Sequence, residues 1–119
     1  MQYLLMAYVD EKLWPTLTTA EKEQRMSAAY GPYVGALNQA GAVKGMNRLR
    51  PTGEAATVRV SDGKPQVLDG PYADSKEQLG GYFLIDVPDL DAALSWAARC
   101  PAAEHGAVEV RPIWVMQQP

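Results

Sequence analysis

The chain has 119 residues, of which 47% are hydrophobic and 21% are charged, and its formal net charge is −3. This is the composition of an ordinary globular protein, and a chain of this length builds one core, so we expect a single domain over residues 1–119. Nucleic-acid binding depends on a basic surface that releases counterions from phosphates. The acidic balance therefore predicts no nucleic-acid partner.

The chain contains one cysteine, Cys100, and one histidine, His105. A single cysteine cannot form an intramolecular disulfide, and the spacing of a zinc site is absent, so we expect no metal and no other cofactor. The apolar run Tyr3 to Val9 has no basic leader and is much too short to cross a bilayer. We expect a cytoplasmic protein without a membrane partner.

The N-terminal region predicts a strand followed by a helix. Residues 2–9 are continuously apolar, as in a central strand that is buried on both faces. A loop through Trp14 and Pro15 follows. Thr18 and Glu21 then have the spacing of a capping box, in which each side chain accepts a hydrogen bond from the other residue's backbone, so a helix begins there.

The predicted helix has one apolar stripe and one residue, Pro32, that is unfavourable inside a helix. Offsets of three and four join its apolar side chains, which are Met26, Ala29, Tyr30, Tyr33, Val34 and Leu37. Gly41 can adopt the left-handed conformation that ends a helix. Pro32 removes a helical hydrogen bond and predicts a kink or break near residues 30–32.

The middle of the chain predicts a strand and a hairpin. Residues 43–50 form the strand, and the even spacing of its cations, Lys44, Arg48 and Arg50, predicts one solvated face or a surface for an anion. Asp62-Gly63 suits the positive φ angles of a tight turn. It lies between residues 57–60 and residues 66–69, which we expect to pair as a hairpin.

The C-terminal third predicts strand, helix, strand. A long apolar strand covers residues 82–87, and Asp89 caps a helix whose buried stripe is Leu90, Ala93, Leu94 and Ala97. Pro101 ends that helix. Residues 107–115 alternate apolar and charged side chains, as in a strand with one buried face.

The order of these elements predicts an α+β fold of the ferredoxin-like, split βαβ type. Two βαβ units are joined by an inserted hairpin, which gives an antiparallel sheet with both helices on one face. The other sheet face would then expose apolar side chains. A second subunit is the simplest cover, so we expect a homodimer that packs through its sheets.

The densest cluster of reactive groups is the run Asp69-Gly-Pro-Tyr-Ala-Asp-Ser-Lys-Glu77. It resembles the signature of the DGPF branch of the YCII-related domain family, Asp-Gly-Pro-Phe-Ala-Glu-Thr-Lys-Glu. The resemblance extends along nearly the whole chain, from the opening strand to the closing Val108 to Pro112. It implies a dimeric α/β-barrel type of fold, in agreement with the strand order.

The family resemblance transfers no mechanism. Another branch is thought to use a His and Asp pair as acid and base, with the histidine on the first helix, and a related protein dehydrochlorinates an aromatic compound. Residues 19–40 contain no histidine. We place His105 in a loop before the last strand, where a surface role is the simpler interpretation.

Two interpretations of the motif remain open. Its polar groups can be occupied by a turn at Gly70-Pro71 and by a short helix capped through Asp74 and Glu77. Alternatively, three side chains project into a cleft, where a lysine beside carboxylates tunes their proton affinity, and these catalytic candidates are Asp69, Lys76 and Glu77.

Four other residues are candidates for ligand binding, namely Tyr8, Tyr33, Tyr72 and Arg111. Tyrosines at strand or helix spacing are also typical of a core, and Arg111 can pair with Glu109 on the same strand face. Two functions follow. The first is a cofactor-independent small-molecule enzyme of lyase or isomerase type, and the second is a non-catalytic dimeric module that binds a ligand or a protein. DGPF-type proteins resemble partners of extracytoplasmic-function sigma factors, which favours the second.

Overall fold

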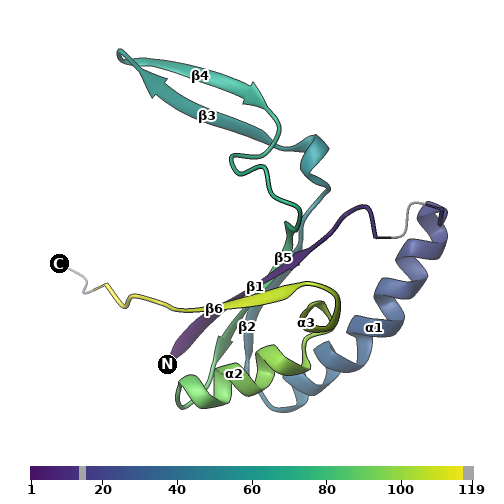
Figure 1. Cartoon of the computed structure of the whole chain (residues 1–119). Coiled ribbons are helices and arrows are strands. Elements are labelled where there is room, and N and C mark those ends of the chain that lie inside the picture. The colour runs from purple at the N-terminus through teal and green to yellow at the C-terminus, as the bar shows by residue number, and fades with distance from the viewer. Residues whose placement is uncertain (14–15, 117–119) are drawn as a thin grey trace.

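The structure is a computed structural model that describes residues 1–13 and 16–116 (Figure 1). The predicted loop residues Trp14 and Pro15 lie outside these ranges. In chain order the elements are β1 (Gln2–Val9), α1 (Thr19–Gln39), β2 (Val43–Arg48), η1 (Thr52–Glu54), β3 (Ala56–Ser61), β4 (Lys64–Asp69), β5 (Gln78–Asp86), α2 (Leu90–Arg99), α3 (Ala102–His105) and β6 (Ala107–Pro112).

The main sheet has four strands in the order β2-β5-β1-β6, and every neighbouring pair is antiparallel. The register pairs Leu4 with Leu84, and a bulge at Gly80 shifts it, because Ala7 pairs with Gly81 but Tyr8 pairs with Leu79. The predicted mixture of helices with an antiparallel sheet is confirmed. Both long helices cover the same face of this sheet (Figure 1).

The core lies between that face and the helices. Leu5 of β1, Ile85 of β5 and Leu37 of α1 are fully buried, and Ala93 and Ala97 of α2 join the same cluster. Burial alternates along β1, so its other face, with Leu4 and Met6, is only half-buried within one chain. The prediction that β1 is buried on both faces is therefore wrong for a single subunit, because none of the described residues covers the second face.

The capping predictions for α1 are confirmed. Glu21 donates its backbone N–H to the Thr18 hydroxyl at 3.1 Å and accepts the Thr18 backbone N–H at 3.3 Å. Gly41 follows the helix with a φ of 66°. Of the predicted kink or break near residues 30–32, the break is absent, since α1 continues through Pro32. The carbonyl of Ala28, which has no N–H of residue 32 to accept from, belongs to an exposed residue and can bond to water.

The predicted hairpin forms but does not join the main sheet. β3 and β4 pair only with each other, and together they make an arm, residues 56–69, that leaves the body (Figure 1). The turn is the expected one, with φ angles of 52° at Asp62 and 75° at Gly63. The described chain is therefore extended, with a radius of gyration of 16.4 Å.

The last third differs from expectation in three places. α2 is capped by Asp89 as predicted, but the short helix α3 follows it, so His105 ends a helix rather than lying in a loop. β6 stops at Pro112 rather than at residue 115, although Ile113 still donates its N–H to the Gln2 carbonyl of β1 at 2.9 Å. Residues 70–77 form bends, so the short helix expected at Asp74 is absent from this described segment. No helix in the described part of the chain is long and apolar enough to cross a membrane.

Candidate functional site

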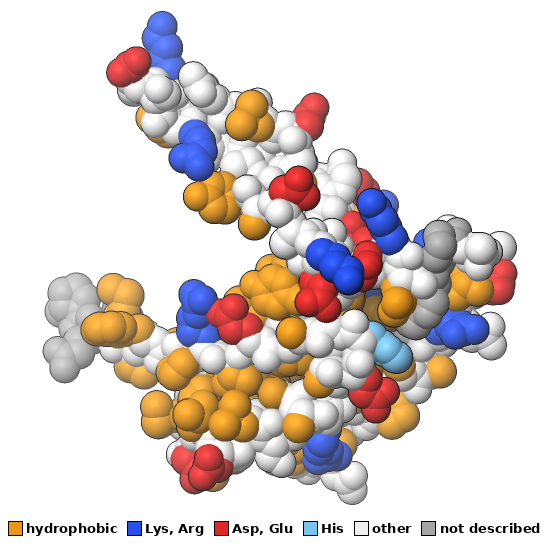
Figure 2. All heavy atoms as spheres, viewed as in Figure 1, with side chains coloured by type: hydrophobic (Ala, Val, Ile, Leu, Met, Phe, Trp, Pro, Cys, Tyr) orange, Lys and Arg blue, Asp and Glu red, His pale blue; other side chains and the backbone are white. Residues whose placement is uncertain are grey.

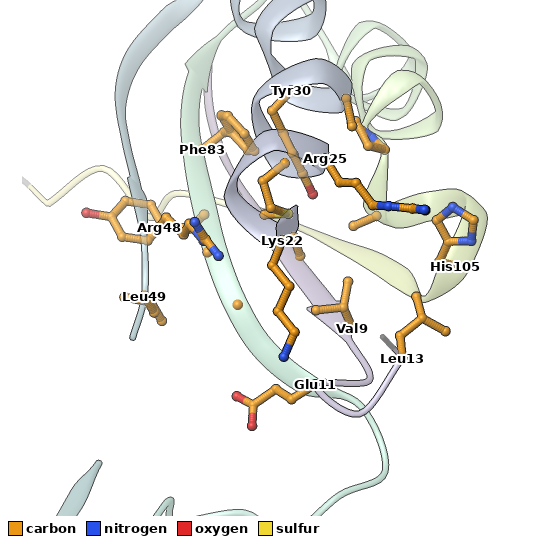
Figure 3. Close-up of a pocket in the computed structure, with 18 of the residues that line it drawn as sticks. Val9, Glu11, Leu13, Lys22, Arg25, Tyr30, Arg48, Leu49, Phe83 and His105 are labelled. Carbon is orange, nitrogen blue, oxygen red and sulfur yellow. The ribbon is translucent and has the colours of Figure 1, made fainter. Parts of the chain in front are cut away.

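A pocket of about 890 Å³ opens between the N-terminal half of α1 and the sheet (Figure 3). Its origin lies in the uneven packing of α1. The buried side chains of that helix, Tyr33 and Leu37, both belong to its C-terminal half. Earlier along the same stripe, Met26 is only half-buried and Ala29 is exposed, although both line the pocket. The first turns of α1 thus form a wall rather than part of the core.

The inside of the pocket is apolar and has an aromatic end. Tyr30 stacks on Phe83 with ring centroids 6.2 Å apart and an angle of 17° between the rings. The floor is bare backbone at Gly81, where a Cβ would lie 2.9 Å from the carbonyl oxygen of Asn47. The remaining apolar lining includes Ala7, Val9, Met26, Val34 and Met46. A flat, apolar molecule fits such a surface.

Charged side chains surround the mouth. Lys22 and Arg25 extend from α1 across the opening, and Arg25 points toward His105 on the other side (Figure 3). Arg48 enters from β2 and is held by Glu23 of α1, whose two carboxylate oxygens both lie 2.8 Å from one guanidinium nitrogen. Three basic side chains and one imidazole at one opening provide contacts for an anionic group.

Three acidic side chains, Asp10, Glu11 and Glu104, also line the mouth, and the first two accept hydrogen bonds from the protein, Asp10 from the Lys12 backbone N–H at 2.9 Å. Glu11 accepts hydrogen bonds from the backbone N–H and the hydroxyl of Thr52, at 2.9 and 2.7 Å. Glu104 lies 4.0 Å from His105, its neighbour on α3. Lys22, in contrast, makes no ion pair within the described residues. Lys22 is therefore the group best placed to contact a bound anion.

Burial fixes the protonation of the groups behind the aromatic end. Burial raises the pKa of the Tyr30 and Tyr33 hydroxyls above the ordinary value of 10.0, and the adjacent Cys100 adds to the shift. Burial also raises the pKa of the Cys100 thiol. Near neutral pH, Tyr30 therefore stays a neutral phenol that interacts with the Cys100 thiol and does not act as a base, and Cys100 stays a thiol.

The three residues predicted as catalytic lie outside this pocket. Asp69 is exposed at the end of β4, at the base of the arm. Lys76 lines a smaller polar depression together with Asp74 and Gln78, and this depression adjoins the pocket at Asp10, which lines both. Glu77 lies against the turn before β6, where its carboxylate would be 3.1 Å from a Cβ at Gly106. The structure does not bring these three side chains to one cleft.

The four predicted ligand-binding residues are also dispersed. Tyr33 is buried and donates its hydroxyl to the backbone carbonyl of Trp96 at 2.9 Å. Tyr8 lies on the open face of β1, and Tyr72 is 76% exposed beneath the guanidinium of Arg59. Arg111 pairs with Glu109 at 2.6 Å on β6, as the alternative interpretation predicted.

Sequence reasoning named Arg48 as part of a possible anion surface, but it did not select three other residues that line the pocket mouth, which are Lys22, Arg25 and His105. A signal was present, because the apolar stripe of α1 extends backward by four residues from Met26 to Lys22. A charged residue in line with a core stripe indicates that the helix leaves the core there. The described residues contain no cluster of His, Cys, Asp or Glu that is able to hold a metal ion.

The family model of the YCII-related domain matches residues 1–117. The chain belongs to the YCII-related family. This YCII-related protein is 41% identical over 118 residues to an uncharacterised protein of Rhizobium meliloti, covering 95% of this chain and 92% of that protein.

Among solved structures, the YCII-related chain is similar to 5-chloro-2-hydroxyhydroquinone dehydrochlorinase from Burkholderia phenoliruptrix, in complex with 2,5-dihydroxybenzoquinone. The two are 12% identical, with a TM-score of 0.48 over 96% of this chain and 94% of the other. A likeness at this level says nothing about shared chemistry.

Proposed function

We propose that this protein is a small-molecule enzyme that acts, by proton transfer, on a flat apolar molecule carrying a negative charge. One observation carries the proposal: the pocket of about 890 Å³ has an apolar, aromatic interior and basic groups at its mouth. Pockets of this volume with a few convergent polar groups are typical small-molecule sites. The reaction class is that of a lyase or an isomerase, in which a proton leaves carbon and the resulting negative charge needs stabilisation.

The roles follow from position. His105 is the acid or base, because an imidazole is the side chain best suited to exchanging a proton near neutral pH. Lys22 and Arg25 bind the substrate anion and stabilise charge that develops on it. Tyr30 supplies its ring, which stacks with Phe83 to form the platform for a flat substrate, while its hydroxyl interacts with Cys100 and the Ala102 backbone. This assignment moves the site from the Asp69 to Glu77 motif to α1.

The homodimer predicted from the sequence is retained as part of the proposal. The main sheet has a half-buried apolar second face, to which Leu4, Met6, Tyr82 and Leu84 contribute. In the ferredoxin-like arrangement that we propose, of dimeric α/β-barrel type, this face packs on a second copy. The buried free thiol of Cys100 supports a reducing compartment such as the cytoplasm.

The test begins with ligand-induced thermal stabilisation against a library of aromatic and aliphatic carboxylates and phenols. A bound compound at a hundred times its dissociation constant adds about 2.7 kcal/mol of stability. Lys22→Met should weaken that compound at least about tenfold, the effect of losing a charged hydrogen bond. The matched control is Lys12→Met, which removes a lysine from the polar depression outside the pocket.

The catalytic part has its own measurement. His105→Gln should keep the affinity for the compound but abolish its turnover, measured by product formation or by exchange of a substrate hydrogen with solvent. If the compound binds without turnover in the unaltered protein, the alternative function, a ligand-binding module linked to sigma-factor regulation, takes its place. Binding that Lys22→Met leaves unchanged would place the site elsewhere and contradict the proposal.

A further inference from the structure

The arm has one face that is mostly apolar and an opposite face that is mostly polar, apart from the exposed Leu68 opposite Thr57. Val58 is paired with Val67, and Val60 is paired with Pro65, so these four side chains share a face of the two-stranded sheet. The valines on it are 60%, 65% and 68% exposed. On the opposite face Arg59 is paired with Gln66. Such a division is typical of a sheet that covers something with one side and meets water with the other.

Nothing in the described part of the chain covers the apolar face. Every residue of β4 and all but one residue of β3 are exposed. The arm is fixed at its base, where Gly70 donates its N–H to the Ala55 carbonyl at 2.7 Å and Thr57 donates its hydroxyl to the Gly70 carbonyl at 2.9 Å. A two-stranded hairpin without such cover is marginally stable in water.

The accessible area indicates how large a cover is needed. The chain exposes 8608 Å², whereas a compact monomer of its 13.0 kDa exposes about 6,300 Å². The radius of gyration is 16.4 Å, against about 13.5 Å for a compact domain of this length. The excess area of about 2,300 Å² matches what one subunit buries in a large obligate dimer, about 1,000–2,500 Å².

The arm is one wall of a notch. The arm and the segment after β6 leave the sheet in different directions, and the space-filling view shows a hollow between them with hydrophobic side chains at its base (Figures 1 and 2). The segment after β6 adds exposed Trp114, Val115 and Met116, at 89%, 80% and 78% exposure. The same chain thus carries a projecting apolar arm and an apolar hollow.

We propose that the arm is a clasp for a second copy of this chain, whose body occupies the notch while its own arm reaches back. A two-fold axis lets one chain supply both arm and notch, so that both apolar surfaces are covered at once. This deepens the homodimer proposed above by naming a second contact surface, separate from the sheet face. It does not depend on the substrate or on the pocket.

The test changes the apolar face while keeping the hairpin. Val58→Glu with Val67→Lys places an ion pair across the strands on the apolar face, where directly paired opposite charges support a sheet. The matched control, Arg59→Glu with Gln66→Lys, places the same ion pair on the polar face. Light scattering should give about 26 kDa, twice 13.0 kDa, for the unaltered protein and the control. The Val58 and Val67 variant should require at least a hundredfold higher concentration to dimerise.

Hydrogen exchange gives a second measurement that does not depend on variants. The amides of β3 and β4 should exchange more slowly at 100 µM than at 1 µM protein, because the clasp forms only in the dimer. If the unaltered protein is a dimer and the Val58 and Val67 variant dimerises equally well, the clasp is wrong and the sheet-face dimer stands. A 13.0 kDa monomer at all concentrations overturns both. Neither result affects the pocket tests.

Discussion

The two halves of α1 continue one apolar stripe but have different environments. In the C-terminal half, Tyr33 and Leu37 are buried against the sheet and α2. In the N-terminal half, Lys22 and Met26 face an opening rather than a packed layer. The same helical periodicity therefore serves the core at one end and a pocket at the other. The difference shows that a stripe specifies a face of a helix, while tertiary packing decides how much of that face is filled.

The largest expected effect is a difference in the free energy of unfolding between substitutions in the two halves of α1. Leu37→Ala removes a fully buried side chain and should lower the free energy of unfolding by about 2–5 kcal/mol. Met26→Ala should cost less than about 1 kcal/mol, because its side chain already borders a cavity, but should weaken ligand binding in the pocket. Urea unfolding measures both. Equal losses of stability would mean that the N-terminal half is packed as tightly as the C-terminal half.

An intermediate effect is expected on the pH dependence of stability, through Tyr30 and Tyr33 at the junction of the two halves. Burial raises the pKa of Tyr30 and Tyr33 in the folded protein, so the unfolded chain releases these protons at lower pH. Stability should therefore be fully present below about pH 10 and fall as the pH rises further, by at most about 1.4 kcal/mol per pH unit for each tyrosine.

Unfolding in urea at several pH values between 8 and about 11 would measure this decline. Tyr30→Phe should flatten the pH dependence, whereas Tyr72→Phe, at an exposed position, should leave it unchanged and is the control. A decline of equal steepness in Tyr30→Phe would show that Tyr30 is solvated, and that the pocket has no dry inner end.

The smallest expected effect concerns the motif outside the pocket. Asp69→Asn should change the free energy of unfolding by less than about 0.5 kcal/mol, because the carboxylate is exposed, and should leave the affinity for a pocket ligand unaltered. Lys76→Met should behave in the same way. Calorimetric titration with the library compound checks both. A loss of binding in either variant would place the ligand site at the Asp69 to Glu77 motif. The loose packing of the N-terminal half of α1 would then have no role in binding.

The caps and turns were predicted correctly because each depends only on residues that are close in the sequence. The capping box at Thr18 and Glu21, the left-handed Gly41 and the Asp62-Gly63 turn each depend on neighbouring backbone groups, and each is present as expected. The resemblance to the YCII-related family is confirmed by the match over residues 1–117, while membership of the DGPF branch stays a prediction from the Asp69 to Glu77 run.

Features that depend on distant contacts were not predictable in this way. The Asp62-Gly63 turn specifies a hairpin but not whether the hairpin joins the main sheet, and here it stands apart as the arm. Pro32 was expected to interrupt α1, but its cost depends on whether the freed carbonyl reaches water. The pocket arises from the angle between α1 and the sheet, which no single residue encodes, so its mouth at Lys22 and His105 was missed.

Gly106 determines which wall of the pocket is able to move. A Cβ at this position would overlap the carbonyl oxygen of Tyr8, so the turn that carries His105 lies directly on the backbone of β1. His105 and the end of β1 thus form one rigid block, joined to the central strand of the sheet. The opposite wall, the first turns of α1, has no buried side chain and is tied to β2 by the exposed ion pair of Glu23 with Arg48. We therefore expect that any widening of the pocket breaks this exposed ion pair and moves the start of α1, while the buried pair Tyr33 and Leu37 keeps the rest of the helix on the sheet.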